Sequence, residues 1–258
     1  MRSSMSSTKK RGCVKIDGAV IVITGGLGSL GQAISQHLLS EGATTILLDS
    51  ESEQSREFLG SEFHHVDLVD NFETSKIFSR IASAHSRIDG LVNCAGLIHS
   101  QAFARFSKSG VEMQSLEVFR EVIDKNLVTT FNATSACVHE MISRRLSGAI
   151  TNISSITSVG NSGQVAYSSA KAAVDSLTVS LAGELGPLGI RVNAILPGFI
   201  DTVSTRRSLG TDYLDRVSRA TPLRRLGEMV SVAQMVRTCF ENEFLTGALI
   251  KVSGGLRL

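Results

Sequence analysis

The residues in this sequence best suited to acid–base chemistry are Tyr167 and Lys171, which lie four positions apart. On a helix, side chains at this spacing lie on the same face. An ammonium close to a phenol favours the phenolate and lowers the phenol's pKa from about 10 toward neutral pH. A tyrosine tuned in this way can exchange a proton with a substrate oxygen. The same spacing also fits a packed aromatic beside a solvated lysine, so other features must distinguish the two interpretations.

A glycine-rich turn near the N-terminus is a candidate phosphate-binding loop. The apolar run Ala19–Ile23 is typical of a strand buried on both faces, and it leads into Thr24–Gly31. Within that turn, Gly26–Gly31 matches G-x-G-x-x-G, and helical spacing of apolar residues follows from Leu30 to Leu39. Backbone N–H groups at such a helix start can bind a pyrophosphate if side chains do not hold it away. A tight turn that binds no ligand is the alternative interpretation.

An acidic residue ends the second predicted strand. The run Thr45–Leu48 is apolar and is followed by Asp49, at about the distance from the glycine loop that dinucleotide sites require. A carboxylate there accepts hydrogen bonds from the adenosine ribose and repels a 2′-phosphate. The strand, loop, helix, strand and aspartate together predict a site that prefers NAD to NADP.

Strands and helices alternate along the rest of the chain. Further strands are expected at 63–66, 88–92, 148–153, 191–195 and 247–252, and helices at about 71–86, from 116 past 131, and from 167 to 185. Residues 107–110 are expected to be irregular. This alternation predicts an α/β fold: a single doubly wound Rossmann-type domain over residues 16–258, with a seven-stranded parallel sheet and helices on both faces.

Several residues are functional candidates because of their place in this fold. The carboxyl ends of parallel strands line the cofactor crevice of such sheets. Asn126 lies within an apolar helix face and is either a satisfied core group or a functional one. The polar segment 199–225 is expected to be a mobile lid over the substrate. The strand-end candidates are Asp67, Asn93, Cys94 and Gly96.

Composition excludes several other classes of protein. The 258 residues carry a net charge of +2, which does not favour nucleic acid as a partner. No apolar run approaches the roughly 18 to 20 residues of a membrane span, so a soluble protein is expected. Four scattered cysteines suggest neither a disulfide framework nor a metal site, and they fit a cytoplasmic location. Residues 1–15 contain no acid and are expected to be a disordered tail rather than a targeting segment.

The motifs resemble those of the short-chain dehydrogenase/reductase family over nearly the whole chain. Within that family the chain is most similar to the type-2 3-hydroxyacyl-CoA dehydrogenases, through stretches at 47–49, 92–96, 115–119 and 243–247. The bacterial 3-oxoacyl-carrier-protein reductases are the next most similar group. The matching motifs are Thr24–Gly31, Asn93-Cys94-Ala95-Gly96, Asn126, Asn152-Ile153-Ser154-Ser155, Tyr167 with Lys171, and Pro197-Gly198.

The resemblance implies a set of site residues. Tyr167 would be the proton donor and acceptor, and Lys171 would lower its pKa and hold the nicotinamide ribose. Ser155 would orient the substrate oxygen, and Asn126 would support a water-linked proton relay. Hydride would pass between the nicotinamide and the carbinol carbon. The implied cofactor-binding residues are Gly25, Ser29, Leu30, Gly31, Asp49, Asp67, Leu68, Asn93, Cys94, Ala95, Gly96, Tyr167, Lys171, Pro197, Gly198, Ile200 and Thr202.

The chain departs from the family pattern at two places. Ser29 replaces the second glycine of T-G-x-x-x-G-x-G; its hydroxyl could donate to a phosphate, or its Cβ could push the pyrophosphate outward. We expect cofactor binding to be retained. The family interval of thirteen residues before Tyr167 leads to Ser154, whereas the strand motif selects Ser155. We favour Ser155 and a one-residue deletion in the loop, because strand pairing is harder to shift than a loop.

The sequence therefore predicts an NAD(H)-dependent oxidoreductase that interconverts a secondary alcohol and a ketone, with a 3-hydroxyacyl or 3-oxoacyl thioester as the substrate class. One alternative is an NADPH-dependent carrier-protein or polyketide ketoreductase, although Asp49 has no arginine beside it. Another is a regulatory protein that binds the cofactor without chemistry, which Ser29 alone supports. The resemblance implies a homo-oligomer, either a tetramer or a dimer.

Overall fold

A seven-stranded sheet lies at the centre of the computed structural model, which describes residues 13–51, 60–108, 110–202, 205–206 and 210–258. The strand order is β3-β2-β1-β4-β7-β8-β9, and neighbouring strands pair in parallel. The predicted seven-stranded parallel sheet is confirmed. The strands are β1 (Val20–Thr24), β2 (Thr44–Asp49), β3 (Glu62–His65), β4 (Gly90–Asn93), β7 (Gly148–Ile153), β8 (Ile190–Pro197) and β9 (Leu249–Val252).

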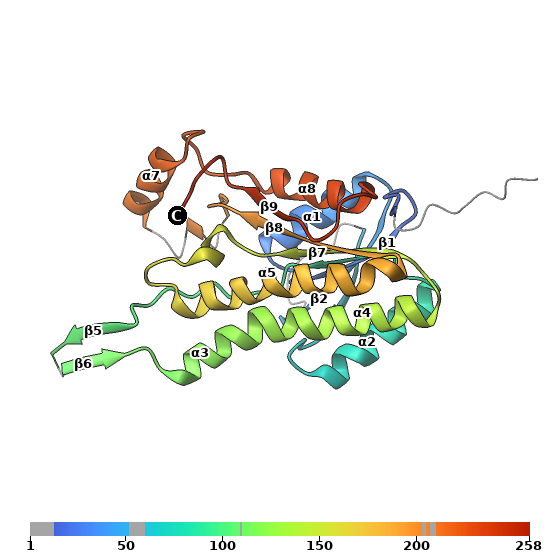
Figure 1. The fold of residues 1–258 in the computed structure, drawn as a ribbon, viewed down its shortest axis with the longest axis horizontal. Helices are drawn as coiled ribbons and strands as arrows, with labels where there is room; N and C mark the ends of the chain where they lie inside the picture. Colours follow the sequence, from blue (N-terminus) through green and yellow to red (C-terminus); the bar gives the residue numbers. More distant parts are fainter. Residues whose placement is uncertain (1–12, 52–59, 109, 203–204, 207–209) are drawn as a thin grey trace, which may run out of the picture.

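Helices cover both faces of the sheet, as predicted (Figure 1). Helices α1 (Ser29–Ser40) and α8 (Met229–Glu241) pack on one face, where Ile34, Leu38 and Phe240 are fully buried. Helices α2 (Asn71–His85), α4 (Thr129–Ser143) and α5 (Val165–Leu185) cover the other face. Because both faces are covered, every residue of β1, β7 and β8 is buried, and these strands read as continuous runs rather than alternating ones.

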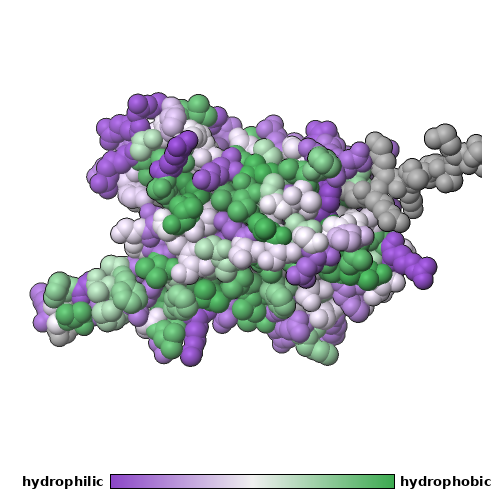
Figure 2. Space-filling model, viewed as in Figure 1, coloured by the Kyte–Doolittle hydropathy of each residue, from purple (hydrophilic) through white to green (hydrophobic). Residues whose placement is uncertain are grey.

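An antiparallel hairpin replaces the irregular segment expected at 107–110. Strands β5 (Ala104–Ser107) and β6 (Gly110–Met113) pair with each other and project from the body of the molecule (Figure 1). One face carries apolar side chains, including Phe106 with 91% of its surface exposed, and the other carries the ion pair between Arg105 and Glu112. Figure 2 shows hydrophobic residues on the projecting hairpin. Strands of four residues are too short for their alternation to stand out in the sequence.

The long helix expected from residue 116 is interrupted. It comprises α3 (Leu116–Ile123), a π-helical turn (Asp124–Val128) and α4. The turn adds one residue to the helical repeat without ending the helix, so a periodic pattern does not reveal it. Asn126 lies in this turn and is fully buried.

The described part of the chain begins at residue 13, before the predicted boundary at residue 15. Residues 1–12 lie outside the described part, but Val14 is buried in the core and its N–H donates to the Phe240 carbonyl at 3.2 Å. A single apolar residue after a basic stretch is too weak a signal to show this packing. Among the described helices, none combines the length and apolar character needed to cross a membrane.

The predicted lid at 199–225 is partly described. It contains α7 (Thr211–Ala220), while residues 203–204 and 207–209 lie outside the described part. The start of the segment is joined to its far end, because Gly227 donates to the Phe199 carbonyl and accepts from the Asp201 N–H, at 2.9 and 2.8 Å. Movement of this lid stays a prediction.

Candidate active site

The glycine loop packs directly against the end of β4. Gly25 has a φ of +65°, and a Cβ at this position would lie 2.7 Å from the Ala95 Cα. The Thr24 hydroxyl accepts hydrogen bonds from the N–H groups of Cys94 and Ala95, both at 3.1 Å. A Cβ on Gly31 would collide with the Gly25 carbonyl oxygen. These glycines are therefore required by close approach within the chain, and they bring the loop next to the Cys94–Gly96 turn.

Helix α1 begins at Ser29, the position that departs from the family pattern. The N–H groups of its first residues have no carbonyl in a preceding turn of the helix to donate to. The first intrahelical hydrogen bond runs from the Gln32 N–H to the Gly28 carbonyl at 2.9 Å. The preceding Gly28 offers no side-chain cap, and the first turn holds no acid. The N–H groups of Ser29, Leu30 and Gly31 can thus receive an anion. A helical position does not need glycine's freedom, which explains why serine fits there.

The Asp49 carboxylate is held at the mouth of this loop. One carboxylate oxygen accepts from the Leu27 N–H at 3.0 Å and the other from the Glu51 N–H at 3.1 Å. Each oxygen keeps a second lone pair, so both can accept a further hydrogen bond from a ligand hydroxyl.

Tyr167, Lys171 and Ser155 come together where α5 passes the end of β7. Tyr167 and Lys171 are 8% and 5% exposed, and the ammonium lies 5.7 Å from the centre of the phenol ring. The Ser155 hydroxyl lies next to the Tyr167 phenol and lowers its pKa. The neighbouring Ser154 points elsewhere, because its hydroxyl donates to the Lys171 carbonyl at 3.3 Å. The structure thus brings Ser155, and not Ser154, to the phenol.

Thr157 orients the Ser155 hydroxyl, and the sequence analysis missed it. The Ser155 oxygen accepts from both the Thr157 N–H, at 3.1 Å, and the Thr157 hydroxyl, at 2.9 Å. With two hydrogen bonds accepted, the serine's own proton is left to donate to another oxygen. The signal was present in the sequence as a Ser-x-Thr spacing after a strand, which favours such a local turn.

Burial governs the proton affinities of the pair. It raises the pKa of Tyr167 to about 12, against the lowering effect of the Ser155 hydrogen bond. It lowers the pKa of Lys171 to about 8. The pKa-lowering role implied for Lys171 stays a prediction, because desolvation sets the net direction here. The ammonium donates to the Ile153 carbonyl at 2.8 Å and lies over the ring, so its effect is weaker than desolvation.

The Asn126 side chain has hydrogen-bond partners at its amide nitrogen but not at its amide oxygen, among the described residues. Its amide nitrogen donates to the carbonyls of Val122 and Leu97, at 2.8 and 3.0 Å. Its Oδ1 is buried and has no hydrogen-bond partner among the described residues. A Cβ on Gly96 would lie 2.6 Å from that oxygen and 3.5 Å from the Lys171 ammonium, so both groups border the same glycine. Such an arrangement suits a bridging water.

The other candidates fall into two groups. Some side chains are turned away from the crevice: the Asn93 amide donates to Thr134 and Asn152, and Leu68 and Ile200 are buried in the core. These residues can contribute only backbone groups to a ligand. The rest stay near the strand ends: Asp67, which accepts from Lys125 at 3.3 Å, half-buried Cys94 and Ala95, Pro197 and Gly198 at the end of β8, and Thr202.

Comparison with known proteins identifies the family. The model of the short chain dehydrogenase family matches residues 19–212. The chain belongs to the short-chain dehydrogenase family. It is an oxidoreductase that acts on CH–OH groups, and the family uses NAD or NADP. The glycine cradle, the N–H groups at the start of α1 and the open Asn126 oxygen all fit a bound dinucleotide.

Its relatives in this short-chain dehydrogenase family cover nearly the whole chain. It is 32% identical to the type-2 3-hydroxyacyl-CoA dehydrogenase of Bos taurus over 262 residues, which spans 95% of this chain and 98% of the relative. It is 35% identical to the 3-oxoacyl-(acyl-carrier-protein) reductase of Aquifex aeolicus, over 94% and 99% of the two chains. The ligand-free aldohexose dehydrogenase of Thermoplasma acidophilum has the same fold, with a TM-score of 0.83 and 26% identity over 95% and 96%.

Replacing Lys171 with methionine should change how stability depends on pH. The folded protein binds this lysine's proton more weakly than the unfolded chain does, so wild type gains stability as pH rises above 8. Relative to Lys171→Met, the free energy of unfolding of wild type should rise by about 2 kcal/mol between pH 7 and pH 10. Urea unfolding at both pH values measures this difference.

The exposed Lys108, changed to methionine, is the control and should leave the pH dependence unchanged. If the free energy of unfolding of Lys171→Met changed with pH in the same way as that of wild type, the claim that Lys171 is buried and weakly basic would be contradicted.

Proposed function

We propose that this enzyme interconverts a secondary alcohol and a ketone with NAD(H), using Tyr167 as its acid and base. The observation that carries the proposal is the buried Tyr167 phenol beside Ser155, with Lys171 and the open Asn126 oxygen bordering nearby Gly96. When bound, the nicotinamide would supply or accept the hydride. The chain's own task is then to orient the substrate oxygen and to move one proton.

Tyr167 and Ser155 act on the same substrate oxygen. With a pKa of about 12 the phenol is protonated at neutral pH, so it can donate its proton to the oxygen of a ketone as charge develops there. The Ser155 oxygen accepts both hydrogen bonds from Thr157, so its O–H can donate to the same substrate oxygen. In the reverse direction the phenol oxygen accepts the alcohol proton.

Lys171 and Asn126 support proton exchange behind the phenol. A pKa of about 8 lets the Lys171 amine gain and lose a proton near working pH. A water held by the Asn126 Oδ1 would link this amine to solvent, as the family resemblance implies. The position of Lys171 beside Gly96, in the predicted cofactor crevice, also supports the implied contact with the nicotinamide ribose.

Asp49 supports NAD as the cofactor. Its carboxylate is fixed at the glycine loop by two backbone N–H groups, with lone pairs left for ribose hydroxyls. A 2′-phosphate would meet this negative charge at close range.

An acyl thioester is the proposed substrate class. Relatives covering nearly the full chain are named for 3-hydroxyacyl-CoA and for 3-oxoacyl groups on a carrier protein, and both kinds carry oxygen at the third carbon of an acyl thioester. The exposed Leu97 and Ile98 follow Gly96 directly and offer apolar surface to an acyl chain.

A second candidate is an NADPH-dependent carrier-protein reductase. The 35% identity to the Aquifex aeolicus reductase favours it. The two candidates differ in cofactor, and the position of Asp49 supports the first.

We also propose that the enzyme assembles as a dimer or tetramer of identical chains. Helices α4 and α5 lie on the same face of the sheet, and both keep large apolar side chains exposed, among them Phe131, Ile142 and Val179. Paired copies would bury this surface.

A substrate panel with NAD tests the reaction type. Wild type should oxidise 3-hydroxyacyl-CoA faster than sugars or steroids, measured by NADH absorbance. Tyr167→Phe should reduce kcat by at least about 1,000-fold, because the acid and base is lost, while NADH binding measured by fluorescence changes little. Comparable activity in Tyr167→Phe would refute the assignment, and activity on sugars alone would refute the substrate class.

The two neighbouring serines form a matched pair for testing the geometry. Ser155→Ala removes a donor to the substrate oxygen and should lower kcat about 100-fold or more. Ser154→Ala loses one hydrogen bond to the Lys171 carbonyl and should stay within about threefold of wild type. Steady-state kinetics on both variants shows which serine acts on the substrate. A larger loss of kcat in Ser154→Ala than in Ser155→Ala would overturn the role of Ser155.

Removing the Asp49 carboxylate should narrow the preference for NAD. In Asp49→Ala the ratio of kcat/KM with NAD to that with NADP should fall at least about tenfold, because repulsion of the 2′-phosphate disappears. Glu51→Ala, an exposed acid two residues later, is the control and should leave the ratio unchanged. An equal ratio in Asp49→Ala and wild type would reject this account of cofactor choice.

A further inference from the structure

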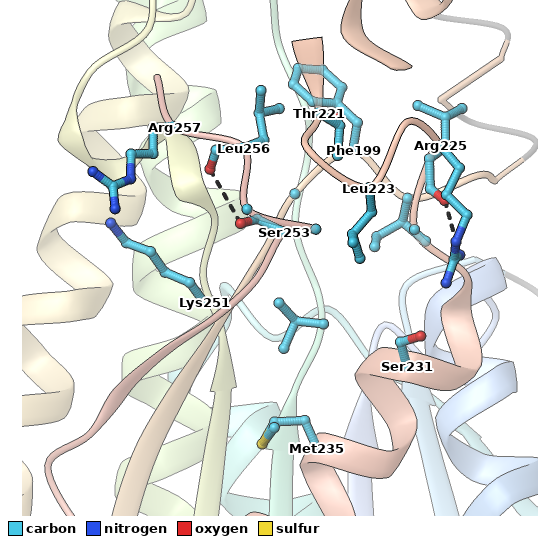
Figure 3. Close-up of a pocket in the computed structure, with 17 residues that line it drawn as sticks. Phe199, Thr221, Leu223, Arg225, Ser231, Met235, Lys251, Ser253, Leu256 and Arg257 are labelled. Atoms are coloured by element: carbon cyan, nitrogen blue, oxygen red, sulfur yellow. Dashed lines mark hydrogen bonds between the residues drawn. The ribbon is translucent and has the colours of Figure 1, made fainter. Parts of the chain in front are cut away.

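A cavity borders the loop that follows β8. It has a volume of about 700 Å³, within the usual range for small-molecule sites. Its walls are residues 198–200, the segment between α7 and α8, one side of α8, and residues 251–257 (Figure 3). Neither Tyr167 nor its partners Ser155, Lys171 and Asn126 line it. The cavity therefore lies outside the Tyr167 group, although its lining includes Gly198 and Ile200 of the implied cofactor-binding residues.

The lining combines apolar surface with positive charge. Leu223, Met235 and Val252 provide apolar side chains. Lys251 and Arg257 lie on one side of the cavity and Arg225 on the opposite side (Figure 3). No aspartate or glutamate is among the described residues of the lining. The positive charge of Lys251 and Arg257, with no acid beside them in the described lining, favours an anionic occupant.

Two of these cations face each other. Lys251 and Arg257 are exposed, and Figure 3 shows the ammonium and the guanidinium directed toward one another. Among the described residues, neither forms an ion pair, whereas Arg225 pairs with Glu228 at 3.0 Å. Like charges that converge repel, and an anion bound by both would reverse the sign of that interaction.

From this lining we infer that the cavity binds an amphipathic anion, with a carboxylate or phosphate head and an apolar chain. The head would lie at Lys251 and Arg257, and the chain along Leu223, Met235 and Val252. The occupant would touch Gly227, which pairs with Ile200 in the loop that carries the predicted nicotinamide contacts. The inference does not depend on the proposed substrate.

Calorimetric titration of the full chain tests the inference, with octanoate, octyl phosphate, 1-octanol and acetate as probes. Octanoate or octyl phosphate should bind saturably, and the tighter of the two identifies the head group. Octanol, which lacks the charge, and acetate, which lacks the chain, should each bind at least about tenfold more weakly. The double variant Lys251→Gln/Arg257→Gln should weaken binding of the better probe at least about tenfold.

Two further variants make the result decisive. Lys15→Gln/Arg120→Gln removes one exposed lysine and one exposed arginine outside the cavity, and should bind as wild type does. Leu223→Trp fills the apolar part from a position that is 64% exposed, so it should abolish binding without unfolding the protein, as thermal melting will show. Absence of saturable binding by wild type, equal affinity for octanol, or binding by Lys251→Gln/Arg257→Gln within twofold of wild type would each overturn the inference.

Discussion

The contact between the glycine loop and the end of β4 is the constraint on which the rest of the site depends. Thr24 accepts two backbone N–H groups from Cys94 and Ala95, and Gly25 approaches Ala95 so closely that no side chain fits. This contact sets the start of α1 against the turn that ends at Gly96. Gly96 in turn borders both Asn126 and Lys171. One packing contact therefore connects the predicted pyrophosphate site to the proton-handling groups.

A polar network below the site holds the supporting elements in register. The Asn93 amide on β4 donates to Thr134 on α4 and to Asn152 on β7, and Asn152 donates to Thr178 on α5. All four residues are buried, so each unmade hydrogen bond would cost about 1–3 kcal/mol. The helix that carries Tyr167 and Lys171 is thus tied to the two strands whose ends form the crevice.

Two polar groups of the site are buried in positions that cost stability. Lys171 is placed where its charge is costly, and its single described side-chain hydrogen bond is to the Ile153 carbonyl. The buried Asn126 oxygen is likewise left without a partner among the described residues. Buried polar groups of this kind are rare in cores selected only for stability, and they are common where a ligand or water completes them.

The sequence by itself determined the sheet, the glycine loop, Asp49 and the spacing of Tyr167 and Lys171. Continuous apolar strands and helical periods are local patterns, and the loop glycines follow from a local turn. Only the tertiary structure decided that Ser155 rather than Ser154 meets the phenol, because the direction of two adjacent side chains depends on how β7 packs against α5. It also decided the pKa values of Tyr167 and Lys171, since desolvation is set by everything packed around a group. The π turn at Asn126 was hidden because it is a one-residue shift within a helix, and the β5–β6 hairpin because its strands have only four residues each. The cationic cavity was hidden because distant segments of the chain create it.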